Sequence, residues 1–196
     1  MMTPLGTVAE VSTGYPFRKK VETEEGGDIV LVQIKDLGGA EGVKVSGSVV
    51  LRNHQGKYER YLLRTGDLLF QSRGLRYPIA MVGPGIRGIA AAGLHVIRPI
   101  PGRVLAPYLA WWLSHPKSQV KIRDDLARGT YIPFVSKRDL EGFLVPVPSL
   151  EVQRRIVEVD KLRAGEKHLR QRLGELTQQL VDGVTWAAAT SKHSRK

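Results

Sequence analysis

Short apolar runs, separated by Gly- and Pro-rich connectors, fill the first hundred residues of the chain. Runs of this length, bounded by turn residues, are typical of β-strands. A Thr-Gly-Asp turn at residues 65–67 divides one apolar stretch into two extended pieces. The expected strands are Val8–Val11 (which also suits a short helix), Ile29–Ile34, Val43–Leu51, Tyr61–Arg64, Leu68–Gln71, Ile79–Val82 and Leu94–Ile97.

The pattern becomes helical at Pro107. Pro107 suits the first position of a helix, and the pair His115-Pro116 ends it. A second helix is expected over Lys117–Ala127, where Val120 and Leu126 should face the core.

A short capped turn and a final strand follow. Ser136 can cap a turn over Lys137–Leu140, and Phe143–Val147 is apolar enough to return as a strand. Strands first and helices later predict an α+β fold with a mixed sheet, not a doubly wound one.

A long helix begins at Ser149, and its apolar residues recur every seven positions. The pattern predicts a coiled coil that pairs two copies of the chain; the alternative is an amphipathic helix packed on its own globular domain. The expected a and d residues are Val159, Leu162, Leu169, Leu173, Leu176 and Leu180, with polar exceptions at Arg155 and Glu166.

These elements divide the chain into three expected parts. Residues 1–148 form a globular domain, residues 149–184 form the long helix, and residues 185–196 form a basic, disordered tail.

Cysteine is absent, which excludes disulfides, thiol catalysis and cysteine-based zinc sites and fits a reducing compartment. No apolar run approaches the roughly 20 residues of a membrane span. The N-terminus lacks the basic and apolar regions of a signal peptide. We therefore expect a cytoplasmic protein without contact with a membrane.

The chain carries 30 Lys and Arg against 19 Asp and Glu, a net charge of +11. Residues 1–149 alone hold 20 basic and 13 acidic residues, so the excess is not confined to a tail. A basic balance of this size favours a polyanionic partner such as nucleic acid, although it also serves solubility.

Three loops mix cations with aromatic, amide or hydroxyl side chains: residues 14–20, residues 71–77, and residues 128–131 together with 136–138. Cations hold phosphates, and Arg or Gln can pair with purine edges in the major groove. Each loop alone also fits a solvated turn. As a set they predict these DNA contacts: Tyr15, Arg18, Lys19, Lys20, Gln71, Ser72, Arg73, Arg76, Arg128, Thr130 and Lys137.

Signals for catalysis, metals and cofactors are poor. The letters of Gly83–Gly88 match a dinucleotide-binding motif, but Pro84 and the short segment that follows favour a plain loop. The five histidines lack ligand spacing. Asp67 lacks the further acid and lysine of a metal-dependent nuclease. We expect no cofactor, no metal site and no catalytic residue.

The chain resembles the specificity (S) subunit of type I restriction–modification systems. The most specific element is Pro146-x-Pro148-x-Leu150-x-x-Gln153 before a long helix. The other matching residues are Leu5-Gly6, Val8, Val11, Gly14–Phe17, Gly66–Phe70, Ser72–Gly74, Tyr108-Leu109, Gly129-Thr130, Ser136-Lys137, Leu140 and Ile156.

This resemblance implies a subunit that recognises double-stranded DNA without cutting it. Such subunits typically have two target recognition domains and two long helices, which dock methyltransferase subunits; a restriction subunit is a further candidate partner. One domain and one helix here imply either a half-size subunit that pairs with itself or a fragment. A symmetric pair predicts two identical half-sites around an unread spacer.

Two other functions compete with this interpretation. A protein-interaction adaptor with a coiled-coil stalk would show little nucleic-acid binding. A nuclease with an unrecognised site would cleave DNA with a metal ion and lose that activity in Asp67→Ala.

Overall fold

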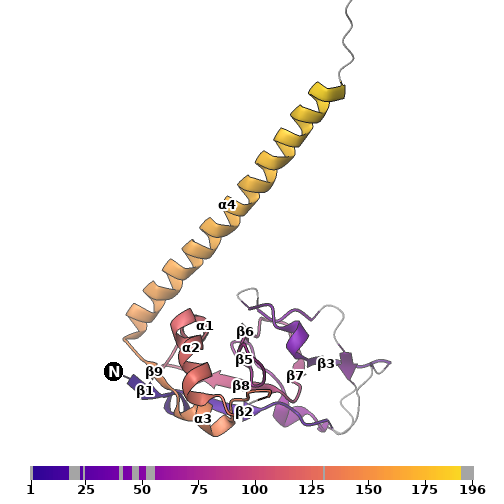
Figure 1. Ribbon diagram of the computed structural model, residues 1–196. Helices are drawn as coiled ribbons and strands as arrows, with labels where there is room; N and C mark the ends of the chain where they lie inside the picture. Colours follow the sequence, from indigo (N-terminus) through magenta and orange to yellow (C-terminus); the bar gives the residue numbers. More distant parts are fainter. Residues whose placement is uncertain are drawn as a thin grey trace, which may run out of the picture. The chain divides into compact units, whose positions relative to one another are not determined.

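The computed structural model describes residues 2–17, 23, 25–39, 42–45, 49–51, 56–129 and 131–190. The chain divides into two compact units, one ending at Arg154 and one beginning at Arg155. Helix α4 (Leu150–Thr190) opens in the first unit and forms the described part of the second (Figure 1). The first unit therefore includes the start of the helix, beyond the boundary expected after residue 148.

A four-stranded antiparallel sheet lies at the centre of the first unit. Its order is β2 (Ala9–Thr13), β8 (Leu94–Pro99), β5 (Leu68–Gln71) and β6 (Ile79–Met81). Successive residues of a strand face opposite sides of a sheet, yet Leu68, Leu69 and Phe70 are all fully buried. Both faces of the sheet at β5 are therefore covered.

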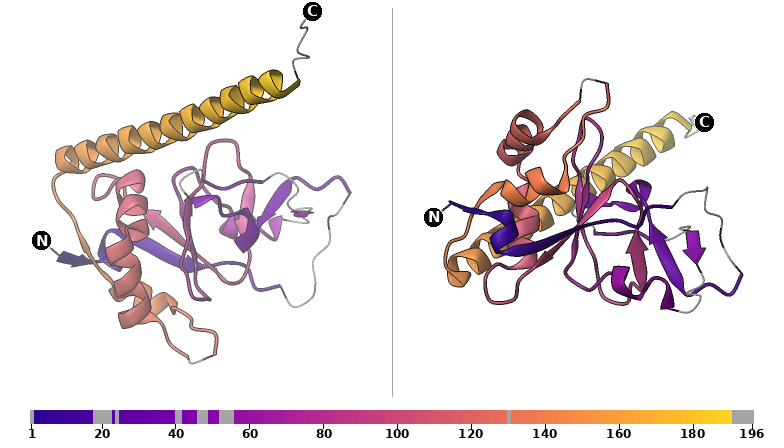
Figure 2. Two further views of the ribbon diagram at one scale, coloured as in Figure 1. Left: turned by 45° about the horizontal axis from the view of Figure 1, so that its top comes forward. Right: turned by 90° about the horizontal axis from the view of Figure 1, so that it is seen from below.

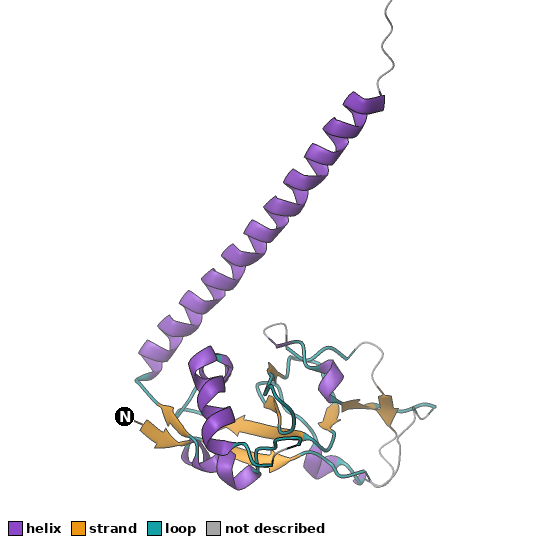
Figure 3. Ribbon diagram, in the orientation of Figure 1, coloured by secondary structure: helices purple, strands orange, loops and turns teal. Residues whose placement is uncertain are grey.

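A second sheet has the order β4 (Val49–Leu51), β3 (Ile29–Val32) and β7 (Gly88–Ala90). Strand β3 pairs antiparallel with β4 and parallel with β7, so this sheet is mixed. A two-stranded antiparallel sheet joins β1 (Met2–Pro4) to β9 (Leu144–Pro146). In Figures 1 and 3, β1, β9 and the short helices lie at one end of the unit and the β3 sheet lies at the other.

The short helices pack on the central sheet. Helix α1 (Ala106–Ser114) contacts β6 and β8, and α3 (Lys137–Gly142) contacts β2. Helix α2 (Pro116–Lys121) runs into a π-helical turn over Ile122–Leu126. Single 3-10 turns cover Leu5–Thr7, Ile34–Asp36 and Glu59–Tyr61. These elements, with the strands, confirm the predicted α+β fold with a mixed sheet.

Several predicted elements differ in extent. The strand from Ile29 ends at Val32, because a 3-10 turn begins at Ile34. The described part of Val43–Leu51 is a strand only over Val49–Leu51. The segment Tyr61–Arg64 forms no strand; Leu62 alone makes an isolated bridge to Ile89. Helix α4 continues to Thr190, beyond the end expected at residue 184.

The predicted inward position of Val120 is wrong, because this side chain is 46% exposed. Ser118 and Ile122, four positions apart, are buried, so Val120, two positions from each, falls on the opposite side of the helix. Ile122 faces the core instead, and Leu126 is buried as predicted.

A buried amide fixes the first turns of α4 within the first unit. Gln153 is fully buried; its Oε1 accepts from the Leu105 N–H at 2.9 Å, and its Nε2 donates to the Pro148 carbonyl at 2.9 Å. Leu105 directly precedes α1. One side chain thus ties the start of α4 to the start of α1, which explains glutamine at the end of the Pro-x-Pro-x-Leu-x-x-Gln motif.

Replacing Gln153 with leucine is expected to lower the free energy of unfolding by about 1–3 kcal/mol, because the Leu105 N–H and the Pro148 carbonyl lose their partner. Urea denaturation measures the change. Gln178→Leu, at an exposed position on the side of the same helix away from the a and d residues, is the matched control and should change stability by less than about 0.5 kcal/mol. Equal effects of the two substitutions would contradict this role for Gln153.

In the second unit α4 presents a long apolar stripe. All six predicted a and d residues are exposed, by 47% at Leu176 and up to 69% at Leu169. Val184, also exposed, continues the stripe by one turn, because it follows Leu180 by four positions. Among the described residues, no helix combines the length and the apolar character needed to span a membrane.

Candidate nucleic-acid interface

Two predicted loops, far apart in the sequence, form one surface. The Gly74 N–H donates to the Pro133 carbonyl at 2.9 Å, and the Val135 N–H donates to the Ser72 carbonyl at 2.8 Å. Arg128 and Phe134 exchange two backbone hydrogen bonds of 2.8 Å each. We call Gln71–Tyr77 together with the described residues of 128–134 the two-loop face. The second of these loops is the orange segment that projects from the body in Figure 2.

The two-loop face is strongly cationic. Arg73, Arg76 and Arg128 are exposed, and within the described part of the chain none of them forms a salt bridge. The guanidinium carbon of Arg73 lies 5.9 Å from the ring centroid of Phe134, which steadies the side chain without neutralising it. Lys137 differs, because its Nζ lies 3.5 Å from Oε1 of Glu141 on α3.

Gln71 and Ser72 support this face from within the protein. Ser72 is buried, and its hydroxyl donates to the Gly93 carbonyl at 2.9 Å. The Gln71 Nε2 donates to the Arg73 carbonyl at 2.5 Å. Both donors hold the backbone of the loop, although the Gln71 side-chain oxygen is still available as an acceptor.

Buried His95 supports the second loop. Its Nε2 lies 2.9 Å from the Val135 carbonyl, and its ring stacks on Phe70 with centroids 6.3 Å apart. Burial lowers the pKa of His95 below its usual 6.5, only partly opposed by the Val135 carbonyl and by Glu141. The neutral ring, which donates its Nε2 proton to Val135, is therefore the form that fits the fold.

Stability should fall as the pH drops below about 6.5, because the unfolded chain then binds a proton that folded His95 does not. The folded-state pKa is depressed, so this contribution is present above pH 6.5 and is lost on acidification. Thermal denaturation between about pH 5.5 and 7.5 measures the slope. His95→Gln keeps a donor for Val135 and does not titrate, so its profile should be flatter. Superimposable profiles would contradict the assignment.

Tyr15 belongs to a second cluster, built of aromatic rings and cations. Its ring centroid lies 4.7 Å from Phe17, 5.2 Å from Tyr58 and 5.0 Å from Tyr61. The Lys57 Nζ lies 5.0 Å from the Tyr58 centroid. The guanidinium carbon of Arg60 lies 4.8 Å from the Tyr61 centroid. Tyr58 is only 4% exposed and belongs to the hydrophobic core, against which the other three rings pack. Lys57 and Arg60 are exposed at the edge of this cluster, where they can contact phosphates.

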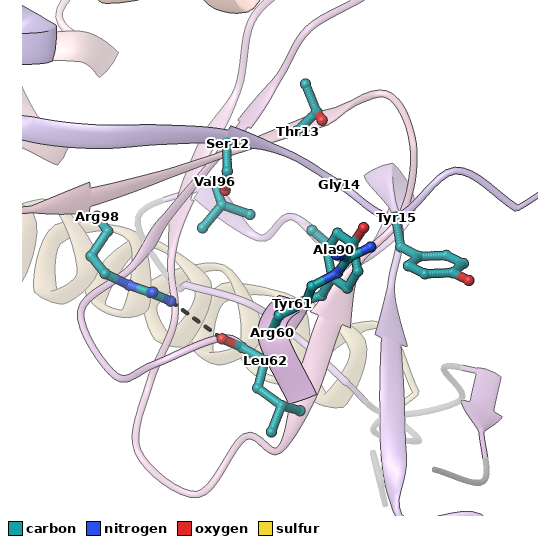
Figure 4. Close-up of a pocket in the computed structure, with 10 residues that line it drawn as sticks. All are labelled: Ser12, Thr13, Gly14, Tyr15, Arg60, Tyr61, Leu62, Ala90, Val96 and Arg98. Atoms are coloured by element: carbon teal, nitrogen blue, oxygen red, sulfur yellow. Dashed lines mark hydrogen bonds between the residues drawn. The ribbon is translucent and has the colours of Figure 1, made fainter. Parts of the chain in front are cut away.

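A cavity of about 300 Å³ opens beside this cluster (Figure 4). Arg98 lines it from β8 and donates to the Leu62 carbonyl at 3.2 Å. The Arg60 guanidinium, two tyrosine rings and two hydroxyls make the cavity suited to an anionic group, whereas the charge of Arg98 is already paired with Asp67. Its lining consists of Ser12, Thr13, Gly14, Tyr15, Arg60, Tyr61, Leu62, Ala90, Val96 and Arg98.

Lys57 and Arg60 were not among the predicted contacts, although Gly56–Tyr61 interleaves cations with tyrosines as the predicted loops do. This pattern was not recognised because a strand was predicted over the adjoining residues Tyr61–Arg64. Four predicted contacts, Arg18, Lys19, Lys20 and Thr130, lie outside the described residues.

Asp67, the carboxylate considered for a nuclease, is 1% exposed and bound on both oxygens. Arg98 donates to Oδ1 at 2.8 Å and to Oδ2 at 2.7 Å, and the Arg64 N–H donates to Oδ2 at 2.8 Å. The bond to Asp67 raises the pKa of Arg98 above its usual value. Among the described residues, no three His, Asp or Glu side chains are grouped as metal ligands.

Comparison with solved structures shows what this fold is similar to. The HsdS subunit from Thermoanaerobacter tengcongensis is 23% identical, with a TM-score of 0.67 over 100% of this chain and 50% of that one. The type I restriction-modification S subunit from M. genitalium is 14% identical, with a TM-score of 0.57 over 99% and 46%. A chain from a structure of the type I R-M system, concerned with complex assembly and conformational transition, is 20% identical, with a TM-score of 0.69 over 93% and 43%.

The chain thus spans about half the length of the solved chains that it matches. No curated protein matches it. A family model described as the type I restriction modification DNA specificity domain matches residues 1–171, which confirms the resemblance carried by the sequence motifs. The protein accordingly belongs to the family of type I restriction–modification DNA specificity domains.

Proposed function

We propose that this chain recognises a specific sequence of duplex DNA and performs no catalysis itself. The observation that carries the proposal is the gathering of three arginines, none of them in a salt bridge with another described residue, on one hydrogen-bonded face of a DNA specificity domain. Arginines on a fixed backbone can pair with guanine edges, while flanking cations hold phosphates.

The proposed contacts follow the accessibility of each side chain. Arg73, Arg76 and Arg128 are the principal readers, Lys137 and the Gln71 side-chain oxygen are secondary, and Tyr15 with Lys57 and Arg60 forms a second contact. Ser72 is left out, because its buried hydroxyl is already used by Gly93. Arg18, Lys19, Lys20 and Thr130 stay in the proposal on their sequence alone.

Selection from a random duplex library, with the chain alone and with its methyltransferase subunit, tests the function. A two-part consensus supports sequence recognition within a type I complex, which directs the methyltransferase and any restriction subunit. Enrichment of no sequence in either sample would overturn the proposal and favour an adaptor.

Alanine substitution of Arg73, Arg76 or Arg128 is expected to weaken binding by about 1–3 kcal/mol where the arginine reads a base, and to relax one position of the consensus. Where it holds a phosphate, all sequences should weaken alike and the salt slope should fall by about 1. Fluorescence anisotropy at several salt concentrations separates the two outcomes.

Arg123→Ala is the control for these substitutions, because this exposed arginine is already paired with Asp124 at 2.9 Å. Its effect on DNA affinity should be small. If all three arginine variants bind like the unsubstituted chain at low salt, the assigned face is wrong.

We also propose that two copies pair through the apolar stripe of α4. The exposed a and d residues have the spacing of a two-helix seam, and symmetric pairing would present two identical reading domains to an inverted repeat.

Leu169→Glu combined with Leu173→Glu should convert the dimer to a monomer in analytical ultracentrifugation. Val181→Glu is the control, because Val181 is exposed at a position off the seam. A monomer for the unsubstituted chain at micromolar concentration, with and without DNA, would contradict pairing.

A further inference from the structure

The two-loop face carries exposed apolar side chains at its tip. Tyr131 is 94% exposed, Leu75 80% and Ile132 58%. We call these three residues the apolar tip. Phe134, closer to the stem, is also exposed and lies beside Arg73. Large apolar groups gathered on a surface mark a binding site, because water solvates them poorly.

The stem beneath the apolar tip is fixed by the backbone. Hydrogen bonds join Gly74 to Pro133, Arg128 to Phe134, and Val135 to Ser72. Below them Ser72 and Val135 are buried. The tip is therefore carried on a stem of paired backbone.

Charge identifies the partner. The two loops contain Arg73, Arg76 and Arg128 and no acidic residue. A polyanion fits the arginines, but its phosphates offer nothing to the apolar tip. In duplex DNA the extended apolar surfaces are the faces of the base pairs, which become accessible only when two neighbouring pairs separate.

We propose that Leu75 and Tyr131 insert between neighbouring base pairs of the bound duplex, while the three arginines hold the flanking phosphates or base edges. This inference rests on the proposed function and adds a wedge to it. Pyrimidine–purine steps open most easily, so the wedge selects a TA or a CA/TG step in each half-site. At that step the protein distinguishes sequences by how easily the two base pairs separate, not by hydrogen bonds to the bases.

Permanganate oxidation of thymine tests the wedge, because it reports unstacked thymines and every favoured step contains one. The probe is the duplex recovered by selection from the random library, bound to the full chain. We expect one thymine per half-site at a CA/TG step, or two at a TA step, to become strongly reactive in the complex. Leu75→Ala and Tyr131→Ala should remove that reactivity and weaken binding on the order of tenfold each.

Two controls make the result specific. Tyr131→Phe keeps the ring and should keep the reactive thymine. Leu144→Ala truncates another exposed leucine, on β9 and outside the two loops, and should change neither reactivity nor affinity. All three positions are exposed, so circular dichroism of the four variants should show unchanged folding.

Failure of the wedge can be told apart from failure of the function. If the unsubstituted chain binds its consensus but no thymine becomes reactive, the wedge is overturned and sequence recognition stands. The wedge is also overturned, and sequence recognition stands, if Leu75→Ala and Tyr131→Ala bind DNA normally and lose only association with the methyltransferase. If no consensus emerges from the selection, both proposals fall together.

Discussion

Replacing Gly14 with alanine is expected to destabilise the globular unit by about 3 kcal/mol or more. A Cβ at this position would lie 2.1 Å from the Ala91 carbonyl oxygen and 2.8 Å from that of Ala90. Both atoms belong to the backbone, and the Tyr15 N–H donates to the same Ala90 carbonyl at 2.7 Å. The backbone at Gly14 and the backbone at Ala90 and Ala91 cannot move apart without breaking the hydrogen bond that positions Tyr15.

Gly83→Ala is the matched control for this substitution. A Cβ on Gly83 meets no atom within 4 Å, and its backbone is compatible with alanine. This change should be neutral or stabilising by up to about 1 kcal/mol, because alanine restricts the unfolded chain. Urea denaturation of both variants gives the comparison. Similar stability of Gly14→Ala and Gly83→Ala would show that the approach at Gly14 can relax.

The second large effect is expected for Asp67→Ala, which leaves the Arg98 guanidinium without its two-point partner inside the unit. Removing one member of a buried pair costs about 3–5 kcal/mol; because the Arg98 side chain is 26% exposed, we expect the lower part of this range. Thermal and urea denaturation should both report the loss.

Asp28→Ala is the control, because Asp28 forms an exposed ion pair with Arg87 at 3.3 Å and should lose less than about 1 kcal/mol. The comparison also tests a nuclease role for Asp67. A variant that keeps full stability but loses metal-dependent DNA cleavage would contradict the structural assignment of this carboxylate.

The strands that the sequence predicted well are those with large apolar residues. Leu68–Gln71 was predicted with these bounds, and the strand predicted as Leu94–Ile97 runs to Pro99. Both lie in the central sheet, where Leu, Ile and Phe fill both faces. Strand β7 was missed because it consists of Gly88, Ile89 and Ala90, which give no apolar run. Its small residues are required by close packing: a Cβ on Gly88 would lie 2.7 Å from the Val30 carbonyl of the parallel neighbour.

The candidate site was predictable in its parts but not in its assembly. Arg73, Arg76 and Arg128 were found from local composition, since exposed loops keep the character of their residues. Their convergence depends on backbone hydrogen bonds between Gly74 and Pro133 and between Ser72 and Val135. No local pattern marks these long-range pairings. For the same reason Ser72, which was predicted to contact DNA, could not be recognised as a buried support.

The backbone pairing of the two loops has a consequence for redesign. The loops are joined through backbone N–H and carbonyl groups, which do not depend on the side chain. The side chains that hold the stem are Gln71, Ser72 and His95. The outward residues Arg73, Leu75, Arg76 and Tyr131 can therefore be randomised together while the scaffold stays intact. A library built at these four positions should yield retargeted variants whose melting temperatures cluster near that of the parent.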